Sequence, residues 1–299
     1  MIPMSGARRV RTVEGMAHSI TARFAAVLLA PVLAVVASLS LGATQAQAVV
    51  GGRDATTTQY PWMVFLSRVD DTTTPSGQFC GGALIAPTKV VTAAHCIDDL
   101  APEQFQVIGG RTNLHSQDGT VRDVVTVWNA PRVPPPAADP GDPSFVAGGD
   151  LSVLTLDEPM PYRTLRMMDT DDGWRYTPWR RATVLGWGIY LEDGLVGPSP
   201  VLQQGRIPMR SYSTCNEAAK AHPAIPFQLD RRFHVCGGWP DGGPAVCGGD
   251  SGSPLVIDGR LAGVVGPILS RGGTVCEDAY SGYTRVDVYA DLIRDQIGR

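Results

Sequence analysis

From Val49 onward, the chain consists of short apolar or alternating runs that are separated by Gly, Pro, Asp and Thr. The clearest runs cover residues 62–66, 82–85, 89–93, 105–108 and 121–127. Runs of this length, broken by turn-forming residues, are typical of antiparallel β-strands. No long helical periodicity interrupts them, so the pattern predicts an all-β protein.

The periodicity changes at residues 287–297, where apolar and charged positions separate onto opposite faces of a helix. The apolar positions are Val288, Leu292 and Ile293, and the charged positions are Asp291, Arg294 and Asp295. We therefore predict a C-terminal α-helix over this range.

The first 48 residues have the pattern of an export signal. Arg23 precedes an apolar run over residues 24–41, and Ala46-Gln47-Ala48 has the small-x-small form of a cleavage site. We predict a signal peptide over residues 1–48, and hence a secreted, extracellular protein that starts at Val49.

A membrane anchor is the rival interpretation of this segment, because the apolar run approaches the length that spans a bilayer. Pro31 and the adjoining cleavage motif argue against an anchor. Met16 is an alternative start of the signal peptide, which leaves the role of residues 1–15 open.

The composition excludes one class of partner and leaves the state of the cysteines open. A net charge of -4 with 18% charged residues provides no basic face for nucleic acid. The chain has 6 cysteines, an even number that permits three disulfides in an oxidising compartment. Buried free thiols are the alternative.

Candidate chemistry is concentrated in residues 245–255, which read A-V-C-G-G-D-S-G-S-P-L. The small residues around Ser251 suit a tight bend whose backbone N–H groups point at one spot. On such a bend Ser251 can act as an exposed nucleophile, with the N–H groups of Gly249 and Ser251 donating to an oxyanion during acyl transfer. Taken alone, the segment is equally compatible with a flexible Gly/Ser surface loop.

Two distant stretches favour the nucleophile, because residues 91–96 read V-T-A-A-H-C and residues 148–154 read G-G-D-L-S-V-L. Together with the serine segment, they resemble the chymotrypsin-like (trypsin-fold, S1 family) serine proteases, in which His, Asp and Ser follow in this order. V-V-G-G at residues 49–52, Y-P-W-M-V at 60–64 and G-W-G at 186–188 also match that family. The resemblance therefore covers nearly all of the chain after residue 48.

The resemblance implies an all-β fold of two antiparallel six-stranded β-barrels that pack together, with a C-terminal α-helix and the active site between the barrels. On this basis, residues 49–299 form one protease domain. The first barrel is expected at about residues 49–159, a polar connector at 160–176, the second barrel at about 177–285, and the terminal helix at about 287–297. We expect this helix to pack on the second barrel.

Residue by residue, the resemblance assigns a catalytic triad to His95, Asp150 and Ser251. A serine hydroxyl is a poor nucleophile near neutral pH, so it needs a base within hydrogen-bonding reach and an acceptor that orients this base. We expect His95 to act as general base and then acid, because its ordinary pKa of about 6.5 lets it change charge in the working range. Asp150 is expected to hold the other ring nitrogen of His95.

Each of these assignments has an alternative. His95 is otherwise a structural imidazole, and Asp150 is otherwise a turn residue whose role falls to Asp142. The apolar strand that follows Asp150 makes it the better match. The remaining histidines lack the local pattern, and we expect them to be surface or loop residues. They are His18, His115, His222 and His234.

Two other functions compete with that of a protease. In α/β-hydrolases the serine lies in a Gly-x-Ser-x-Gly elbow and precedes its partners, whereas here Ser253 stands at the last glycine and both partners precede Ser251. A catalytically weak, protease-like binding protein arises when such folds lose the triad. It stays as the alternative function, although all three residues are present here.

The resemblance also implies contacts for the cysteines and for the new N-terminus. It pairs Cys80 with Cys96, Cys215 with Cys236, and Cys247 with Cys276. After cleavage behind Ala48, the ammonium group of Val49 is expected to pair with Asp250 and order the oxyanion loop, and a buried pair of this kind is costly to break. Our hypothesis is that signal peptidase itself exposes this terminus, without a separate zymogen step.

The expected specificity follows from Ala245. Relatives that cleave after Lys or Arg carry an acid six positions before the nucleophile, and Ala245 occupies that position here. With Val246 beside it, the pocket leaves a cationic side chain without a partner, which is unfavourable. We therefore predict a preference for apolar or small P1 residues over Lys and Arg.

The walls of the predicted S1 pocket depart from the family. Gly266, Pro267 and Ile268 replace its Ser-Trp-Gly sequence, and Ser281 completes the pocket. Gly266 also lacks the hydroxyl that supports the triad acid in relatives, while Ser253 replaces a usual glycine. These departures bear on substrate range and catalytic efficiency more than on reaction type.

A proline-rich segment covers residues 131–143. Because proline lacks the N–H that a central strand donates, this segment cannot pair inside a sheet. We interpret it as an exposed rigid loop. The functional alternative is that it flanks the substrate groove before Asp150 and shapes the non-primed subsites.

No cofactor and no metal site is expected. Some relatives bind calcium in the loop that corresponds to residues 111–122, but only Asp118 is acidic there. The expected partners are protein or peptide substrates, with protein inhibitors left open. We expect a monomer that does not associate with membranes once it is processed. The scarcity of lysine and the Ala-rich export signal fit a bacterial source.

Overall fold

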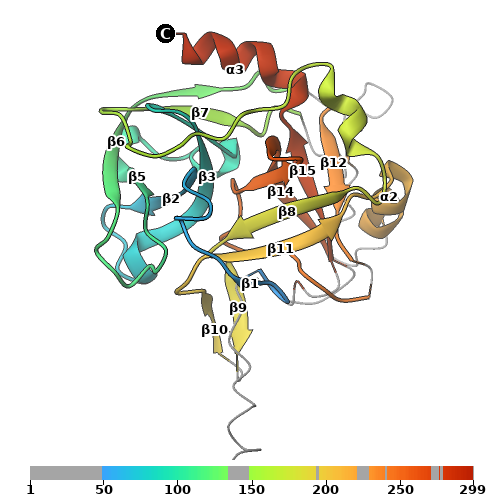
Figure 1. Cartoon of the computed structure of the whole chain (residues 1–299), viewed down its shortest axis with the longest axis horizontal. Coiled ribbons are helices and arrows are strands. Elements are labelled where there is room, and N and C mark those ends of the chain that lie inside the picture. Colours follow the sequence, from blue (N-terminus) through green and yellow to red (C-terminus); the bar gives the residue numbers. More distant parts are fainter. Residues whose placement is uncertain are drawn as a thin grey trace, which may run out of the picture. The chain divides into compact units, whose positions relative to one another are not determined.

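The computed structural model describes residues 49–133, 148–192, 195–220, 229–239, 241–270, 276 and 279–298. The predicted signal peptide over residues 1–48 and most of the proline-rich segment, with Asp142, lie outside these ranges. Within them, β-strands predominate and form a closed barrel, a second large sheet and a hairpin, so the predicted all-β class is confirmed (Figure 1). None of the described helices is long and apolar enough to cross a bilayer.

Six strands close into the predicted first barrel, in the order β2-β3-β4-β7-β6-β5. They are β2 (Met63–Arg68), β3 (Gln78–Ala86), β4 (Lys89–Thr92), β5 (Phe105–Gly109), β6 (Thr120–Asn129) and β7 (Ser152–Leu156). The first five residues of β2 are all buried. Phe65 of this strand packs edge-on against Trp187 of the second half, with ring centroids 5.2 Å apart. A strand that is covered on both faces carries a continuous apolar run instead of an alternating one.

The second sheet contains seven strands in the order β1-β11-β8-β13-β14-β15-β12. They are β1 (Arg53–Asp54), β8 (Arg181–Gly186), β11 (Gln203–Pro208), β12 (His234–Gly237), β13 (Pro254–Ile257), β14 (Arg260–Ser270) and β15 (Ala279–Arg285). All neighbours in this sheet are antiparallel. A separate antiparallel hairpin joins β9 (Ile189–Glu192) to β10 (Leu195–Pro198).

The predicted boundary of the first barrel needs a correction at its start. Although β1 lies within the predicted range of residues 49–159, it joins the edge of the second sheet by pairing with β11. Val49 is likewise buried in the core of the second sheet, in one cluster with Val184 and Leu255. The N-terminal segment therefore belongs to the second half of the fold, and β1 is the seventh strand of the second sheet.

One α-helix, α2 (Tyr212–Lys220), was not predicted from the sequence. Ser211 precedes it, and its hydroxyl accepts a hydrogen bond from the N–H of Thr214 at 3.1 Å, as an N-cap does. Cys215 is buried and forms a disulfide with Cys236 of β12. The helix is thus anchored to the second sheet. Short 3-10 helices occur at η1 (Pro75–Gly77), η2 (Ala94–Cys96), η3 (Pro102–Gln104) and η4 (Asp172–Tyr176).

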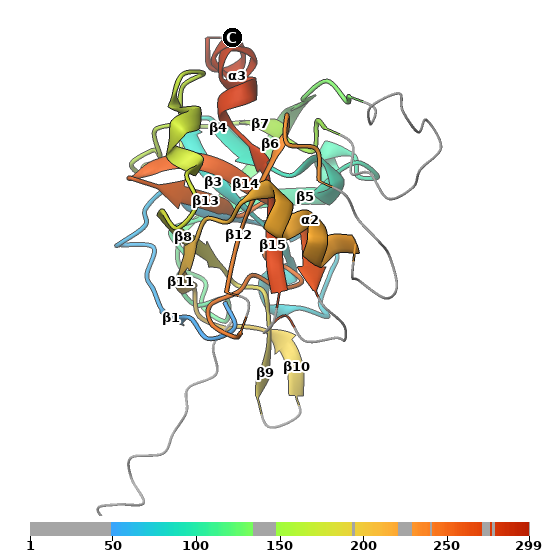
Figure 2. The ribbon, with the colours of Figure 1, turned by 90° about the vertical axis from the view of Figure 1, so that its right-hand side faces the viewer.

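The chain ends in η6 (Asp287–Tyr289) and α3 (Ala290–Ile297), in the predicted range. The predicted apolar face is only partly correct, because Ile293 is buried whereas Val288 and Leu292 are 37% and 40% exposed. Ile293 and Leu84 of the first barrel belong to the same hydrophobic cluster, and α3 lies near β7 in both views (Figure 1 and Figure 2). The same cluster also includes Leu261 and Val264 of the second sheet, so the predicted packing of the helix on the second barrel stays a prediction.

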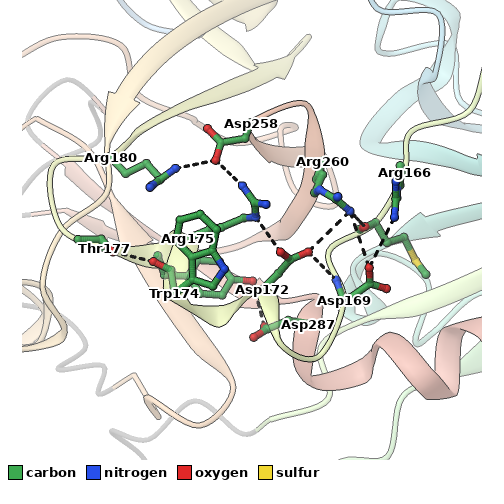
Figure 3. Close-up of polar contacts among 12 residues, drawn as sticks. Arg166, Asp169, Asp172, Trp174, Arg175, Thr177, Arg180, Asp258, Arg260 and Asp287 are labelled. Carbon is green, nitrogen blue, oxygen red and sulfur yellow. Dashed lines mark hydrogen bonds and ion pairs between the residues drawn. The ribbon is translucent and has the colours of Figure 1, made fainter.

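The connector between the halves is held by ion pairs (Figure 3). Asp172 of η4 lies 2.8 Å from Arg175, and Arg175 also lies 2.7 Å from Asp258 in the turn between β13 and β14. Arg294 of α3 pairs with Asp169. The acidic residues that make this connector look like a plain polar loop in the sequence therefore attach it to the second sheet and to the terminal helix.

Candidate active site

Strand pairing brings His95 and Asp150 together. β4 and β7 run antiparallel with Thr92 opposite Ser152, so the residues after β4 meet those before β7. The carboxylate of Asp150 accepts a hydrogen bond from the backbone N–H of His95 at 2.9 Å and lies 2.9 Å from its ring Nδ1. With Nδ1–H directed at the carboxylate, the lone pair of the neutral ring is on Nε2.

The contact between His95 and Asp150 shifts the pKa of both side chains. The hydrogen bond to Asp150 raises the pKa of the His95 imidazole above its ordinary value, although burial acts in the opposite direction. Burial by itself would raise the pKa of the Asp150 carboxyl, but the hydrogen bonds and charge of His95 outweigh it and lower this pKa. The side chains are 46% and 18% exposed, respectively. Asp150 is therefore a largely enclosed anion that can stabilise an imidazolium on the more accessible His95.

Ser251 lies on a tight turn whose shape depends on a glycine. The N–H of Asp250 donates to the carbonyl of Cys247, and the N–H of Ser253 donates to the carbonyl of Asp250, both at 3.0 Å. Gly249 has φ of +86°, a backbone conformation that residues with a side chain rarely adopt. This conformation turns the two peptide groups that flank Gly249 relative to each other.

The peptide at Gly249 is fixed from the first barrel. Gln78, a buried residue of β3, donates from Nε2 to the Gly249 carbonyl at 2.9 Å. Within the described part of the chain, the N–H groups of Gly249 and Ser251 donate to no protein acceptor. Two neighbouring backbone N–H groups without a protein acceptor are suited to bind an oxyanion.

The serine turn, although it belongs to the second half, is pressed against the first barrel. The N–H of Gly81 in β3 donates to the carbonyl of Ser251 at 2.8 Å. A Cβ at Gly252 would overlap the hydroxyl of Thr92, which lies three residues before His95. Within the described residues no hydrogen bond joins Nε2 of His95 to Oγ of Ser251, and such bonds often form fully only with substrate.

Comparison with known proteins identifies the family. The model of the trypsin family matches residues 49–293. The chain belongs to the trypsin family. Similar proteins include a trypsin from Saccharopolyspora erythraea, 38% identical over 83% of this chain and 98% of that protein. A vitellin-degrading protease from Bombyx mori is 31% identical over 83% of this chain and 85% of its own length. Chymotrypsin-C from Bos taurus is 29% identical over 83% and 88%.

Family membership makes the protein a serine endopeptidase, a hydrolase of peptide bonds. Its trypsin-family domain contains three disulfides in the pairing that the resemblance implies, and the described residues include no free cysteine. The pairs are Cys80–Cys96, Cys215–Cys236 and Cys247–Cys276. The first ties β3 to the turn that carries His95, and the third anchors the serine segment.

Asp250 is fully buried beside the serine turn. Its carboxylate accepts hydrogen bonds from the N–H groups of Gly188 at 2.7 Å and Cys247 at 2.9 Å. A Cβ at Gly186 or Gly188 would overlap this carboxylate, so the Gly-Trp-Gly triplet makes room for it. Burial raises the pKa of the Asp250 carboxyl to about 7, although both N–H groups lower it. Within the described residues, no cationic side chain pairs with it.

The N-terminal segment lies against the base of the predicted pocket. Val49 is buried, and the carbonyl of Val50 accepts a hydrogen bond from the N–H of Ala245 at 3.0 Å. Because Ala48 precedes Val49 in this chain, the nitrogen of Val49 is an uncharged amide. The predicted ion pair with Asp250 therefore needs cleavage at this bond.

The predicted pocket residues are only partly described. Ala245 and Ser281 are 4% and 2% exposed. Val246 is fully buried and belongs to the hydrophobic core of the second sheet. Its expected place in the pocket lining stays a prediction. The side chains of Pro267 and Ile268 lie outside the described part of the structure.

The backbone at the expected pocket wall forms an irregularity in the ladder. β14 pairs Val265 with Tyr283 but Ile268 with Ser281, so Gly266 and Pro267 fall in a register shift. Such a bulge tolerates proline because the ladder does not require its N–H. In the described ranges, no group of three or more His, Cys, Asp or Glu side chains is placed to hold a metal ion.

Two site residues were missed by the sequence analysis. Gln78 belongs to no motif, and its only signal is a position two residues before Cys80. His234, predicted to be a surface or loop residue, is 2% exposed and lies on β12, so that expectation is wrong. His115 is exposed as expected, while His18 and His222 lie outside the described residues.

Proposed function

We propose that the protein is a secreted serine endopeptidase whose nucleophile is Ser251, with His95 as general base and acid and Asp150 as the acid that orients the imidazole. The observation that carries this proposal is the double hydrogen bond from His95 to the Asp150 carboxylate, next to the turn that bears the serine. This arrangement leaves Nε2 as the only ring atom that can accept the serine proton.

The geometry supports acyl transfer in two stages. As Oγ of Ser251 attacks the substrate carbonyl carbon, its proton moves to Nε2 of His95, and the negative charge on the carbonyl oxygen is stabilised by the N–H groups of Gly249 and Ser251. The imidazolium then gives the proton to the leaving amine, so the peptide bond breaks. Water then attacks the acyl carbon as His95 takes its proton, and this proton passes to Oγ of Ser251 as the ester bond breaks and the carboxylic acid leaves. Each oxyanion donor contributes about 10²- to 10³-fold to the rate.

Export is supported by residues 1–48 and by the disulfides. Three disulfides are typical of an oxidising compartment. We further propose that signal peptidase, by cutting behind Ala48, exposes the ammonium group of Val49 that pairs with Asp250. The Asp250 carboxylate is buried and has no cationic partner among the described residues. This supports the step, because an added positive charge there stabilises the ionised acid.

A preference for apolar or small P1 residues is supported by the identity of Ala245 and Ser281. Neither side chain supplies a negative charge, so a Lys or Arg side chain at P1 meets no partner from them. An unpaired charge that is removed from water is strongly unfavourable.

The test of the triad is covalent labelling of the purified protease with a serine-directed phosphonate. We expect one equivalent to react at Ser251 and no labelling of the Ser251→Ala variant. An Asp150→Asn variant should retain the fold but lose about 10⁴-fold in kcat, because its amide no longer fixes the imidazole tautomer. Normal labelling of Ser251→Ala would refute the assignment and leave a protease-like binding role as the alternative.

The test of activation compares two forms in the Ser251→Ala background, one that begins at Val49 and one that retains Ala48. With Ala48 present, folded Asp250 binds a proton with a pKa near 7. The folded state then holds more protons than the unfolded state from about pH 4 to pH 7, so stability falls as pH rises through this window. We expect thermal unfolding midpoints to show this fall only in the form with Ala48.

Two controls accompany this comparison. Asp250→Asn removes the titrating group, so the pH-dependent difference between the two forms should disappear. N-terminal sequencing of the secreted protein should begin at Val49. The same pH dependence in both forms, or a mature protein that begins at Gln47 or earlier, would contradict activation by signal peptidase.

The test of specificity uses matched peptide substrates that differ only at P1. We expect leucyl, alanyl or phenylalanyl substrates to exceed the arginyl substrate by at least about 100-fold in kcat/KM, because a buried cation lacks a partner. Ala245→Asp is the control variant, and it should narrow that ratio by supplying a negative charge. Faster turnover of the arginyl substrate by the unchanged enzyme would contradict the prediction.

A further inference from the structure

Gly266 of β14 leaves room for a small side chain beside Asp150. A Cβ at this glycine would lie 3.7 Å from Oδ2 of Asp150 and 3.9 Å from Oγ1 of Thr284, which is ordinary contact distance. The carboxylate and the threonine hydroxyl therefore border the same small space from two sides.

His234 reaches this region from the neighbouring strand. It lies directly opposite Thr284 in the antiparallel pair of β12 and β15. Side chains at such paired positions are on the same face of a sheet, with Cβ atoms about 4.5 to 5.5 Å apart. Both residues are buried, at 2% and 0% exposure. A positive charge on His234 and a negative charge on Asp150 would favour each other, so each residue affects the pKa of the other.

The tautomer of His234 is set by its backbone partner. Nδ1 accepts a hydrogen bond from the N–H of Asp230 at 3.2 Å, so the proton of the neutral ring is on Nε2. Burial lowers the pKa of the His234 imidazole, although Asp230 and Asp150 act against it. His234 is therefore a neutral ring that presents one N–H donor to the protein interior.

The ring N–H of His234 and the hydroxyl of Thr284 both lack a hydrogen-bond partner among the described residues. Both atoms, Nε2 of His234 and Oγ1 of Thr284, are buried. Buried polar groups in folded proteins are almost always bonded, to protein or to ordered water. The carboxylate of Asp150 has spare acceptor capacity, since it takes only the two bonds from His95 among those described.

We propose that His234 and Thr284 are positioning residues for Asp150. Nε2–H of His234 and the hydroxyl of Thr284 donate to one ordered water beside Gly266, and this water donates to Oδ2 of Asp150. This chain of donors ends on the carboxylate and restrains it from the side opposite His95. The inference rests on the proposed role of Asp150 as the acid that orients the catalytic imidazole.

The experiment is a mutant cycle between His234 and Gly266. We expect His234→Met to lower kcat about 10-fold with KM unchanged, because the carboxylate loses a charge-assisted restraint. His234→Gln keeps an N–H donor at a similar reach and should lose less. In the Gly266→Ser background, the new hydroxyl can donate to Asp150 by itself, so His234→Met should lower kcat less than about 3-fold.

A purely structural role for His234 gives a different result. Equal losses in both backgrounds, or no loss in the unchanged background, would overturn the proposal. If Gly266→Ser does not fold, Thr284→Val replaces it. This variant should show the same loss as His234→Met, and the two changes together should lower kcat no further, whereas independent effects would multiply.

Controls separate this inference from the proposed function. Titration of active sites with the phosphonate gives the concentration of folded enzyme in every variant. His115→Met, which removes an exposed histidine, should leave kcat and KM unchanged. Failure of the unchanged enzyme to react at Ser251 would defeat the proposed triad. An active enzyme with independent effects at His234 and Gly266 would defeat only the positioning role.

Discussion

The contact between the serine turn and the first barrel is the constraint on which the site depends. Ser251 belongs to the second half of the fold, while His95 and Asp150 belong to the first. The hydrogen bond from Gly81 to the Ser251 carbonyl, and that from Gln78 to the Gly249 carbonyl, fix one half against the other at the nucleophile. Because β3 supplies both donors, a shift between the halves would disturb the serine and the oxyanion donors together.

Three buried or enclosed carboxylates illustrate three ways of accommodating negative charge. Asp172 in the connector is neutralised by arginine, and the hydrogen bond from Arg175 lowers its pKa. Asp150 is held by His95, whose proton it stabilises. Among the described residues, Asp250 has only backbone N–H groups as hydrogen-bond donors, and burial raises its pKa to about 7. Asp172 thus has its cationic partner in the folded chain, whereas in our proposal Asp250 gains one when cleavage produces a charged N-terminus.

Much of this site could be predicted because its chemistry is local in sequence. Each part of the site lies in a short segment of small residues: the serine turn, the histidine after β4 and the aspartate before β7. Several glycines in these segments are required because a side chain would overlap a neighbour. The pairing of the cysteines came from the resemblance. The antiparallel strands were visible for a similar reason, since their apolar runs end at turn-forming residues.

The features that were not predicted from the sequence depend on contacts between distant segments. The two residues of β1 carry no periodicity, so their pairing with β11 is decided by tertiary packing. The helix α2 is capped by Ser211 and fixed to β12 by the disulfide of Cys215. His234 looks polar in isolation, and its burial follows from the partner strand β15. In each case the deciding neighbour is far along the chain.

The most direct measurement is a crystal structure of the mature enzyme with a phosphonate bound. We expect a covalent bond from Oγ of Ser251 to phosphorus, with a phosphonyl oxygen about 3 Å from the N–H groups of Gly249 and Ser251. Nε2 of His95 should lie within hydrogen-bonding distance of the adduct, with Asp150 still bonded to Nδ1. An adduct on another residue, or an imidazole that stays remote from the bound group, would contradict it.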